Sequence, residues 1–367
     1  MEAFRHGLFS SKKVKDFPFP EREIVEVKAT DTVDSAFRTL VEHKILSAPV
    51  WDEERDMYLG FFDITDALAL IYSVDLLITA IPDSMLQTST ALKLASSGSA
   101  CPDCTDLLVG SIFEDSDANN GMRSQRDSAW NPITNDAPVS QVIFLLATST
   151  RRVPVIDQDT KRVVKILSQS LVTFVLNETI KATESSGDEL PELFNKTPAN
   201  SGGFGLCNVL TVDADKQTAR DAFRMIIENG VSAVAVLDDE GKLLSSITTK
   251  DIRLFKSLEE AALQRLTAEK SKRDAEADNN PKEHLALMDL TCGDFVSMVE
   301  TTATNKGITM APVVTVNKET PIRKMIARLA LTKKHRCFVT DSNRHPIGVV
   351  SVSDIAKLLV TDPNKKE

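Results

Sequence analysis

Gly348-Val349-Val350-Ser351-Val352-Ser353-Asp354 is a short apolar strand that leads into hydroxyl residues and then an aspartate. Three other stretches resemble it: Gly60-Phe61-Phe62-Asp63-Ile64-Thr65-Asp66, Ser245-Ser246-Ile247-Thr248-Thr249-Lys250-Asp251 and, without the acid, Val164-Lys165-Ile166-Leu167-Ser168-Gln169-Ser170-Leu171. We call these stretches corners one (ending at Asp66), two (Leu171), three (Asp251) and four (Asp354). Self-similarity of this kind indicates a repeat architecture, and it determines how the rest of the sequence is interpreted.

The spacing of the corners predicts how the repeats are organised. Asp66 and Leu171 lie 105 residues apart, and Asp251 and Asp354 lie 103 apart. Corners one and three are separated by 185 residues, and corners two and four by 183. The chain is therefore expected to be a duplicated pair of repeats with a short gap between its halves.

The repeats share a predicted order of β-α-β-β-α, which defines a mixed α/β (α+β) fold. In the first repeat, a β-branched strand at 24–28 is followed by a helix whose apolar residues recur at helical spacing, and then by strands at 48–51 and 58–62. A unit this small cannot bury its apolar face alone, so the repeats must pair, and pairing creates clefts between them.

The domain boundaries follow from this order. We expect repeats at 24–80, 131–182, 206–258 and 311–362. Between them lie an N-terminal segment (1–23), a loop insertion (81–130), a linker (183–205) whose Gly-rich end is a flexible joint, and a linker or helical insertion (259–310).

Composition narrows the function classes. The 367 residues carry a formal net charge of −10, which argues against general binding to nucleic acid or anionic lipid. We see no apolar run near the roughly 18 residues of a membrane span and no signal-peptide pattern at the N-terminus. The five cysteines are an odd number, which fits a reducing compartment, so we expect a cytoplasmic protein that is also nuclear.

These residues resemble cystathionine-β-synthase (CBS) domains in two paired, Bateman-type modules. The string Ala48-Pro49-Val50-Trp51-Asp52, the corners, and Val153-Pro154-Val155-Ile156-Asp157 are similar to those of the gamma regulatory subunits of AMP-activated protein kinase. The resemblance implies a non-catalytic, energy-sensing subunit of a heterotrimeric serine/threonine kinase. Its partners would be a catalytic alpha subunit and a beta scaffold, and AMP, ADP and ATP would compete for clefts between the repeats.

The resemblance also implies roles for individual residues. The ribose would be held by the corner acids and hydroxyls Asp66, Asp251, Asp354, Thr65, Thr248, Ser351 and Ser353. The phosphates would be held by Arg151, Arg152, His335, Arg336 and Lys250. No cofactor and no metal is expected.

The chain departs from the family pattern at several of these positions. Leu171 replaces the acid at corner two, as in a customarily empty site, and Asp63 replaces a hydroxyl at corner one. Leu46 and Arg151 stand where arginine and histidine are usual, and Lys250 follows the usual lysine position by one residue. We therefore rank the sites of Asp251 and Asp354 above that of Asp66.

Other readings of the same residues stay open. A Ser/Thr-x-x-Asp tetrapeptide is also a helix-capping pattern that needs no ligand, and the basic pairs could be surface or salt-bridge residues. Cys101-Pro102-Asp103-Cys104 lacks the further ligands that zinc needs. We find no catalytic motif. The alternative function is a free-standing CBS regulator that binds another adenosyl ligand or acts as a scaffold; a CBS-containing enzyme is a distant third.

Overall fold

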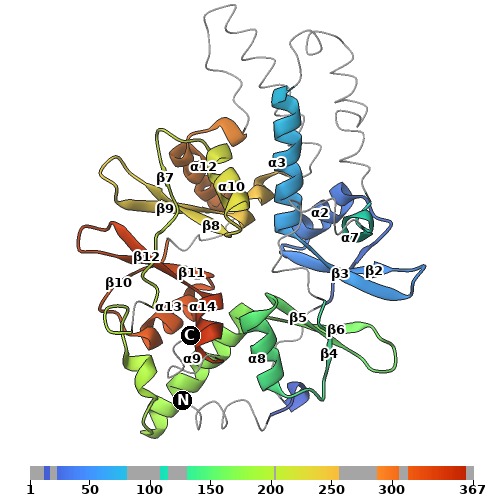
Figure 1. The fold of residues 1–367 in the computed structure, drawn as a ribbon, viewed down its shortest axis with the longest axis horizontal. Coiled ribbons are helices and arrows are strands. Elements are labelled where there is room, and N and C mark those ends of the chain that lie inside the picture. Colours follow the sequence, from blue (N-terminus) through green and yellow to red (C-terminus); the bar gives the residue numbers. More distant parts are fainter. Residues whose placement is uncertain are drawn as a thin grey trace, which may run out of the picture. The chain divides into compact units, whose positions relative to one another are not determined.

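Four three-stranded sheets make up the strands of the described chain (Figure 1). The computed structural model describes residues 12–16, 23–80, 108–114, 130–201, 204–255, 287–305 and 313–360. In each sheet the first strand pairs parallel to the second, and the second pairs antiparallel to the third. Each sheet belongs to one predicted repeat, which confirms the mixed α/β repeat fold.

The elements follow the predicted order in all four repeats, except that a 3₁₀ helix stands in repeat three where the second α-helix was expected. Repeat one comprises β1 (Val27–Lys28), α2 (Val33–Glu42), β2 (Ser47–Asp52), β3 (Met57–Asp63) and α3 (Ile64–Ala80). Repeat two comprises β4 (Ile133–Thr134), α8 (Val139–Thr148), β5 (Arg152–Ile156), β6 (Val163–Ser168) and α9 (Gln169–Ser186). Repeat three comprises β7 (Thr211–Asp213), α10 (Ala219–Glu228), β8 (Ala233–Leu237), β9 (Leu243–Thr248) and the 3₁₀ helix η4 (Thr249–Leu254). Repeat four comprises β10 (Thr315–Asn317), α13 (Ile322–Thr332), β11 (Arg336–Thr340), β12 (Pro346–Ser351) and α14 (Val352–Leu358).

Every sheet carries a β-bulge at the same repeat position. The register between the second and third strands skips one apolar residue, which is Leu59, Val164, Leu244 or Ile347. A bulge bends its strand and increases the local twist. The four copies therefore share a structural detail that their apolar strand patterns did not reveal.

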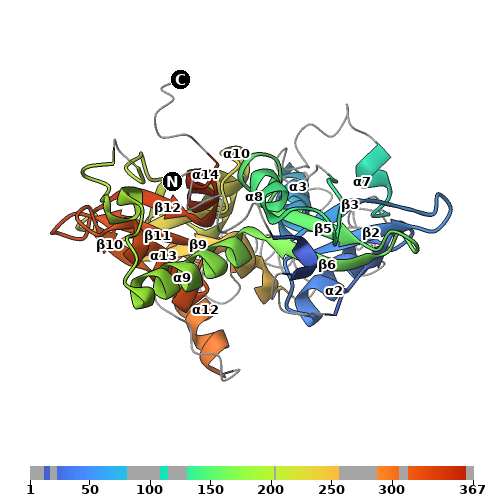
Figure 2. The same cartoon turned by 90° about the horizontal axis from the view of Figure 1, so that it is seen from below.

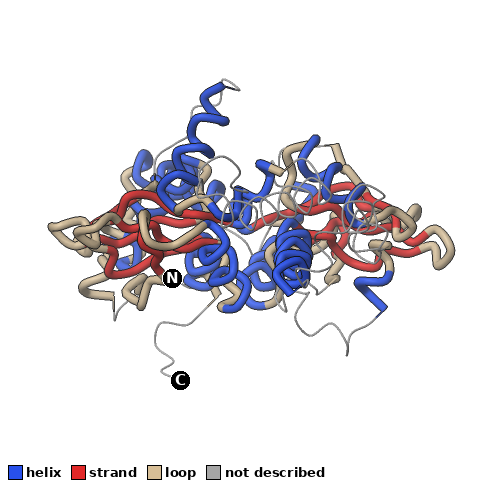
Figure 3. Tube along the Cα trace, turned by 90° about the horizontal axis from the view of Figure 1, so that it is seen from above, coloured by secondary structure: helices blue, strands red, loops and turns tan. Residues whose placement is uncertain are grey.

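The chain divides into two compact units, each containing two repeats that are not consecutive. Repeats one and three lie in a unit of Val25–Gln125 and Leu210–Met310, which we call the 1–3 unit. Repeats two and four lie in a unit of Met1–Ile24, Arg126–Val209 and Ala311–Glu367, the 2–4 unit. Figures 2 and 3 show the strands and helices of the repeats from other sides.

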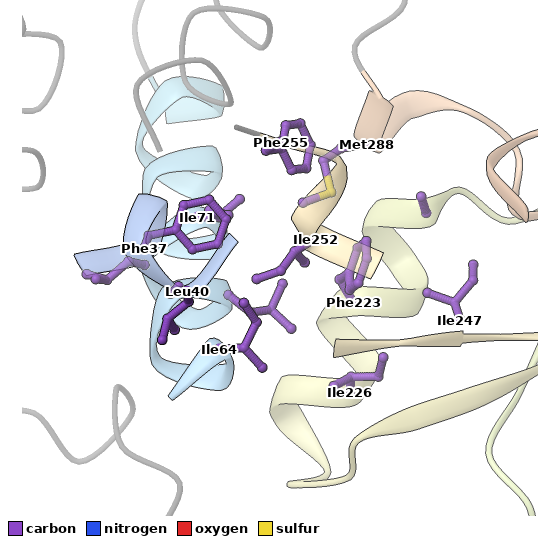
Figure 4. Close-up of a cluster of buried hydrophobic side chains, with 14 of the residues drawn as sticks. Phe37, Leu40, Ile64, Ile71, Phe223, Ile226, Ile247, Ile252, Phe255 and Met288 are labelled. Atoms are coloured by element: carbon purple, nitrogen blue, oxygen red, sulfur yellow. The ribbon is translucent and has the colours of Figure 1, made fainter. Parts of the chain in front are cut away.

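One hydrophobic core fills each unit and joins its two repeats. In the 1–3 unit, Ile64 and Ile71 from α3 belong to the same cluster as Phe223 from α10 and Ile252 from η4 (Figure 4). In the 2–4 unit, α9 packs on α13 and α14, and Leu176 is fully buried in the shared core. Each core thus joins two repeats that alternate in the chain.

Short segments that precede one repeat in the chain bind its neighbour, and we call them crossover segments. Residues 12–16, with the 3₁₀ helix η2 (Val14–Asp16), precede repeat one but bind repeat two, where the Val14 N–H donates to the Ala137 carbonyl at 3.0 Å. Residues 108–114, with α7 (Ser111–Glu114), precede repeat two but bind repeat one, where the Val109 N–H donates to the Asp31 carbonyl at 2.9 Å.

The second half of the chain repeats this exchange. The segment at 192–199, with η3 (Glu192–Asn195), binds repeat four, where the Ile322 N–H donates to the Lys196 carbonyl at 2.9 Å. The segment at 287–305, with η5 (Leu287–Asp289) and α12 (Cys292–Asn305), binds repeat three, where the Cys292 N–H donates to the Gln217 carbonyl at 2.8 Å. The described parts of the predicted insertions and linkers thus belong to neighbouring repeats.

The described end of the predicted flexible joint is packed against repeat four. Phe204 contacts the core of the 2–4 unit, and Gly205 has a φ of +76° and lies against Val350 of β12. Cys101, Cys104 and the charged 258–278 stretch lie outside the described residues. Among the described helices, none has both the length and the apolar character needed to cross a membrane.

Candidate functional site

The acids of corners three and four both form capping boxes. Oδ2 of Asp251 accepts hydrogen bonds from the N–H of Thr248 at 2.7 Å and from its hydroxyl at 2.9 Å. Oδ2 of Asp354 accepts the same two bonds from Ser351 at 2.8 and 2.7 Å. These bonds satisfy N–H groups that a helix start leaves unpaired. The capping role foreseen for the corner acids is therefore real, and it uses one carboxylate oxygen of each.

Capping leaves the second oxygen of Asp354 unused by the protein. Oδ1 of this half-buried carboxylate makes no hydrogen bond within the described part of the chain. A carboxylate oxygen has lone pairs for further donors, such as the hydroxyls of a sugar. Asp354 can therefore cap α14 and accept from a ligand at the same time.

Corner one is closed over by its own acids. Oδ2 of Asp66 accepts from the N–H of Asp63 at 2.8 Å, and Oδ1 of Asp63 accepts from the N–H and hydroxyl of Thr65 at 2.9 and 2.8 Å. Asp63 and Asp66 are only 3% and 7% exposed, so a sugar would reach neither without rearrangement. Corner one thus differs from corners three and four, whose acids Asp251 and Asp354 are only partly buried.

The basic pairs occupy equivalent positions in repeats two and four. Arg152 and Arg336 begin β5 and β11, where their register partners are Ser168 and Ser351. The residues before them, Arg151 and His335, accept through their carbonyls from the first N–H after the third strand of the repeat, that of Gln169 or Val352, at 3.4 and 2.9 Å. Both pairs therefore lie in the 2–4 unit.

The equivalent positions of the 1–3 unit carry no basic residue. The same backbone bond identifies them as Leu46 and Ser47 in repeat one and as Ser232 and Ala233 in repeat three. The Ser47 hydroxyl is buried without a hydrogen-bond partner within the described chain. Lys250, the remaining predicted phosphate ligand, lies in η4 of this unit, where its carbonyl accepts from Arg253 Nε at 3.0 Å. Burial lowers the pKa of the Arg253 guanidinium, although Asp251 opposes that shift.

Side chains of repeats two and four bond directly to each other. The Ser353 hydroxyl donates to Gln169 Oε1 at 2.8 Å, and the Ser170 hydroxyl lies 3.2 Å from His335 Nε2. Corners two and four thus meet inside the 2–4 unit, with the basic pairs at the strand ends beside them. The sequence analysis did not assign Gln169 or Ser170 to the site, because corner two lacks the acid that marks the others.

The side chains at corners two and four supply hydrogen-bond acceptors and cationic groups. Within the described residues, no three His, Cys, Asp or Glu side chains gather closely enough to hold a metal ion. The chemistry available at corners two and four is recognition of a ligand that carries both hydroxyl groups and negative charge.

Comparison with known proteins agrees with the fold. The family model for the CBS domain matches residues 14–73, 206–257 and 306–361. CBS domains are therefore present in repeats one, three and four, and repeat two, which the family model does not match, has a sheet of the same strand order.

The chain resembles a gamma-type subunit, as the sequence predicted, and resembles protein SDS23 to the same degree. It is 22% identical to human 5′-AMP-activated protein kinase subunit gamma-3 over 336 residues, which are 90% of this chain and 55% of that protein. It is also 22% identical to protein SDS23 of Saccharomyces cerevisiae (strain S288c) over 331 residues, which are 88% of this chain and 54% of that protein. The chain thus spans about half the length of these relatives.

A solved structure shares the fold over most of its length. A protein of Methanocaldococcus jannaschii, proposed as an archaeal homologue of the AMP-activated kinase gamma subunit, superposes with a TM-score of 0.56 at 16% identity. The match covers 93% of this chain and 98% of that one. At this identity the likeness establishes the fold.

Proposed function

We propose that the chain is a non-catalytic, adenine-nucleotide-binding regulatory subunit of a heterotrimeric serine/threonine kinase. Its partners would be a catalytic alpha subunit and a beta scaffold, in the cytoplasm and also the nucleus. The resemblance to a gamma subunit supports the kinase role, because that relative's name places it in a kinase activated by AMP.

One observation carries the nucleotide assignment: corners two and four meet in the 2–4 unit. This contact gathers a carboxylate with one oxygen to spare, two serine hydroxyls and both basic pairs into the same unit. A ribose presents hydroxyl donors that suit the carboxylate, and phosphates suit arginine and histidine. A nucleotide combines the two groups in one molecule.

Regulation follows if the competing nucleotides stabilise different arrangements of the repeats. AMP, ADP and ATP share the ribose but differ in phosphate charge, so they would differ in how strongly they engage the basic pairs. A ligand shifts a conformational equilibrium only by its difference in affinity between the two states. We propose that this difference is what the partner kinase reads.

A second candidate is a free-standing CBS regulator that belongs to no kinase. The equal identity to SDS23, which is not named as a kinase subunit, favours keeping this alternative. Purification of the tagged chain from cells distinguishes the two functions. Recovery of a kinase catalytic subunit and a beta scaffold in equal amounts supports the first function, and their absence supports the second.

Nucleotide binding is tested by replacing Asp354 and comparing it with a matched capping acid. Thr218 and Asp221 form a capping box like that of corner four, but at the start of α10 and away from any corner. Either acid changed to alanine should cost about 1 kcal/mol of stability through the lost cap. In calorimetry with AMP and ATP, we expect Asp354→Ala to weaken binding about 10-fold or more and Asp221→Ala to leave it unchanged.

Two results would overturn the proposal. One is a wild-type protein that binds neither AMP nor ATP. The other is an equal loss of affinity in both variants, because this would mean that Asp354 acts through helix stability alone.

A further inference from the structure

Gln169 is a buried amide at the corner that lacks an acid. The equivalent positions of the other corners hold Ile64, Thr249 and Val352, which carry no amide. Gln169 is 8% exposed, and its side chain bonds to one group in repeat two and one group in repeat four. Nε2 donates to the Leu146 carbonyl at 2.7 Å, and Oε1 accepts from the Ser353 hydroxyl at 2.8 Å.

The Leu146 carbonyl fixes the direction of every bond in this chain of contacts. A carbonyl oxygen can only accept, so the amide must place its NH₂ there and its oxygen toward Ser353. That oxygen also can only accept, so the single proton of the Ser353 hydroxyl is committed to Gln169. This order follows from the chemistry of the groups and does not depend on how the amide is drawn. Ser353 therefore has lone pairs but no proton to offer a ligand.

We propose that Gln169 is a positioning residue that makes Ser353 an obligate hydrogen-bond acceptor. Corner four then presents two acceptors side by side in sequence, Ser353 Oγ and Asp354 Oδ1, and selects a ligand group with two donors. Given the proposed function, on which this ligand assignment rests, that group is the vicinal diol of a ribose. Repeat two, which lacks an acid of its own, supports the site of repeat four.

The inference also states what Ser353 does not bind. Phosphate oxygens act as acceptors toward a protein, so they gain nothing from an oxygen whose proton is already donated. The phosphates must then be held by other groups, for which the basic pairs of the same unit are suited. If Gln169 is removed, the Ser353 hydroxyl is free to rotate and the selection for donors is lost.

A double-mutant cycle on AMP binding tests this role. We would measure the affinity of the full chain and of Gln169→Leu, Ser353→Ala and the double variant for AMP and for 2′-deoxy-AMP and 3′-deoxy-AMP. We expect each single variant to bind AMP about 5-fold more weakly, and the double variant to bind no more weakly than Ser353→Ala. For at least one deoxy analogue, which lacks a donor, the losses should shrink to less than 2-fold.

A structural control comes from the same helix. Thr173 is 1% exposed, and its hydroxyl donates to the backbone carbonyl of Gln169 at 3.2 Å without reaching Ser353. Thr173→Val should therefore leave AMP affinity unchanged. A similar cycle on urea unfolding reports whether Gln169 and Ser353 are coupled in the absence of ligand, and no coupling would overturn the inference.

The outcomes separate the two proposals. AMP binding by the wild type with additive losses in the cycle, or an equal loss in Thr173→Val, overturns the positioning role alone. No AMP binding by the wild type overturns the proposed function and the ribose assignment together. Full retention of affinity in Gln169→Leu also contradicts the positioning role.

Discussion

At the scale of single residues, the corner acids illustrate how one side chain serves two purposes. Asp251 and Asp354 each spend one oxygen on a helix cap, and the second oxygen of Asp354 stays outside the protein's own hydrogen bonds in the described chain. Asp63 and Asp66 instead bond within their own corner and are buried. The same short motif therefore leaves a carboxylate oxygen without a partner in the described part of repeat four, while in repeat one its acids bond within the corner.

Buried thiols give a prediction at the same scale. Burial raises the pKa of the Cys337 thiol to about 12, and burial likewise raises that of Cys292 to about 12. Because the unfolded chain ionises these thiols at a lower pH, the stabilising contribution is complete below pH 9 and is lost as pH rises toward 12. We expect the free energy of unfolding, measured with urea, to fall between pH 8 and pH 10.5.

Two cysteine variants check the cause. Cys337→Ala should lower stability at pH 8 by about 1 kcal/mol and make the decline above pH 9 shallower, because only Cys292 of the two buried thiols then remains to ionise. The exposed Cys207 serves as the control, and Cys207→Ala should change neither value. An unchanged alkaline slope in Cys337→Ala would contradict the assignment.

At the scale of elements, the backbone around Gly205 packs closely against strand β12. Gly205 and Gly348 approach so closely that a Cβ added to Gly348 would overlap the Gly205 carbonyl, and a Cβ added to Gly205 would overlap Val350. Gly205 also has a positive φ, a conformation that other residues rarely adopt. This contact attaches the start of the second half of the chain to the sheet of repeat four.

Glycine substitutions test this contact. Gly187, at the end of α9, has a φ of +78° but no atom within 4 Å of an added Cβ, so Gly187→Ala reports backbone strain alone at about 1 kcal/mol. Gly205→Ala adds an overlap with Val350, so we expect at least twice that loss in urea unfolding. Adding Val350→Ala should recover part of the excess. Equal losses for the two glycine variants would show that the contact is loose.

The sequence predicted elements that have a strong local pattern. Apolar periodicity located the helices and central strands of all four repeats, and the corners located the start of the second helices. The bulges at Leu59 and its equivalents were missed, because an extra residue leaves the apolar run unbroken. After corner three the described helix is the 3₁₀ helix η4, where an α-helix was expected.

Candidate site residues could be predicted only where a motif marks them. The acids and basic pairs were found because they recur at fixed positions, and corner four carries the capping bonds that its motif implies. The role of Gln169 depends on a contact with Ser353 across 184 residues, which no local pattern reveals. The crossover segments were missed for the same reason, since their backbone partners lie in another repeat.

At the scale of the whole molecule, every repeat makes two kinds of contact. Backbone hydrogen bonds attach to each repeat a crossover segment that precedes a different repeat in the chain. The hydrophobic cores join repeat one with three and repeat two with four. Each repeat therefore depends both on its partner in the core and on a crossover segment, so a single repeat should not be stable alone.

Cleavage of one loop tests this arrangement. The loop at 187–191, between α9 and η3, is exposed over most of its length and separates the two halves of the chain without cutting a crossover segment. A protease site inserted there should give halves that stay together in size-exclusion chromatography, because each half supplies two repeats to the two cores. Separation of the halves without denaturant would contradict the shared cores.

The crossover segments also constrain how such a gene can change in length. Excision of one copy would strip its chain neighbour of a segment that carries a fully buried side chain, such as Val14 in repeat two or Val109 in repeat one. Excision of the first two copies or of the last two removes both exchange partners and leaves no orphaned surface of this kind. Ancestors and descendants of this chain should therefore have gained or lost copies in even numbers.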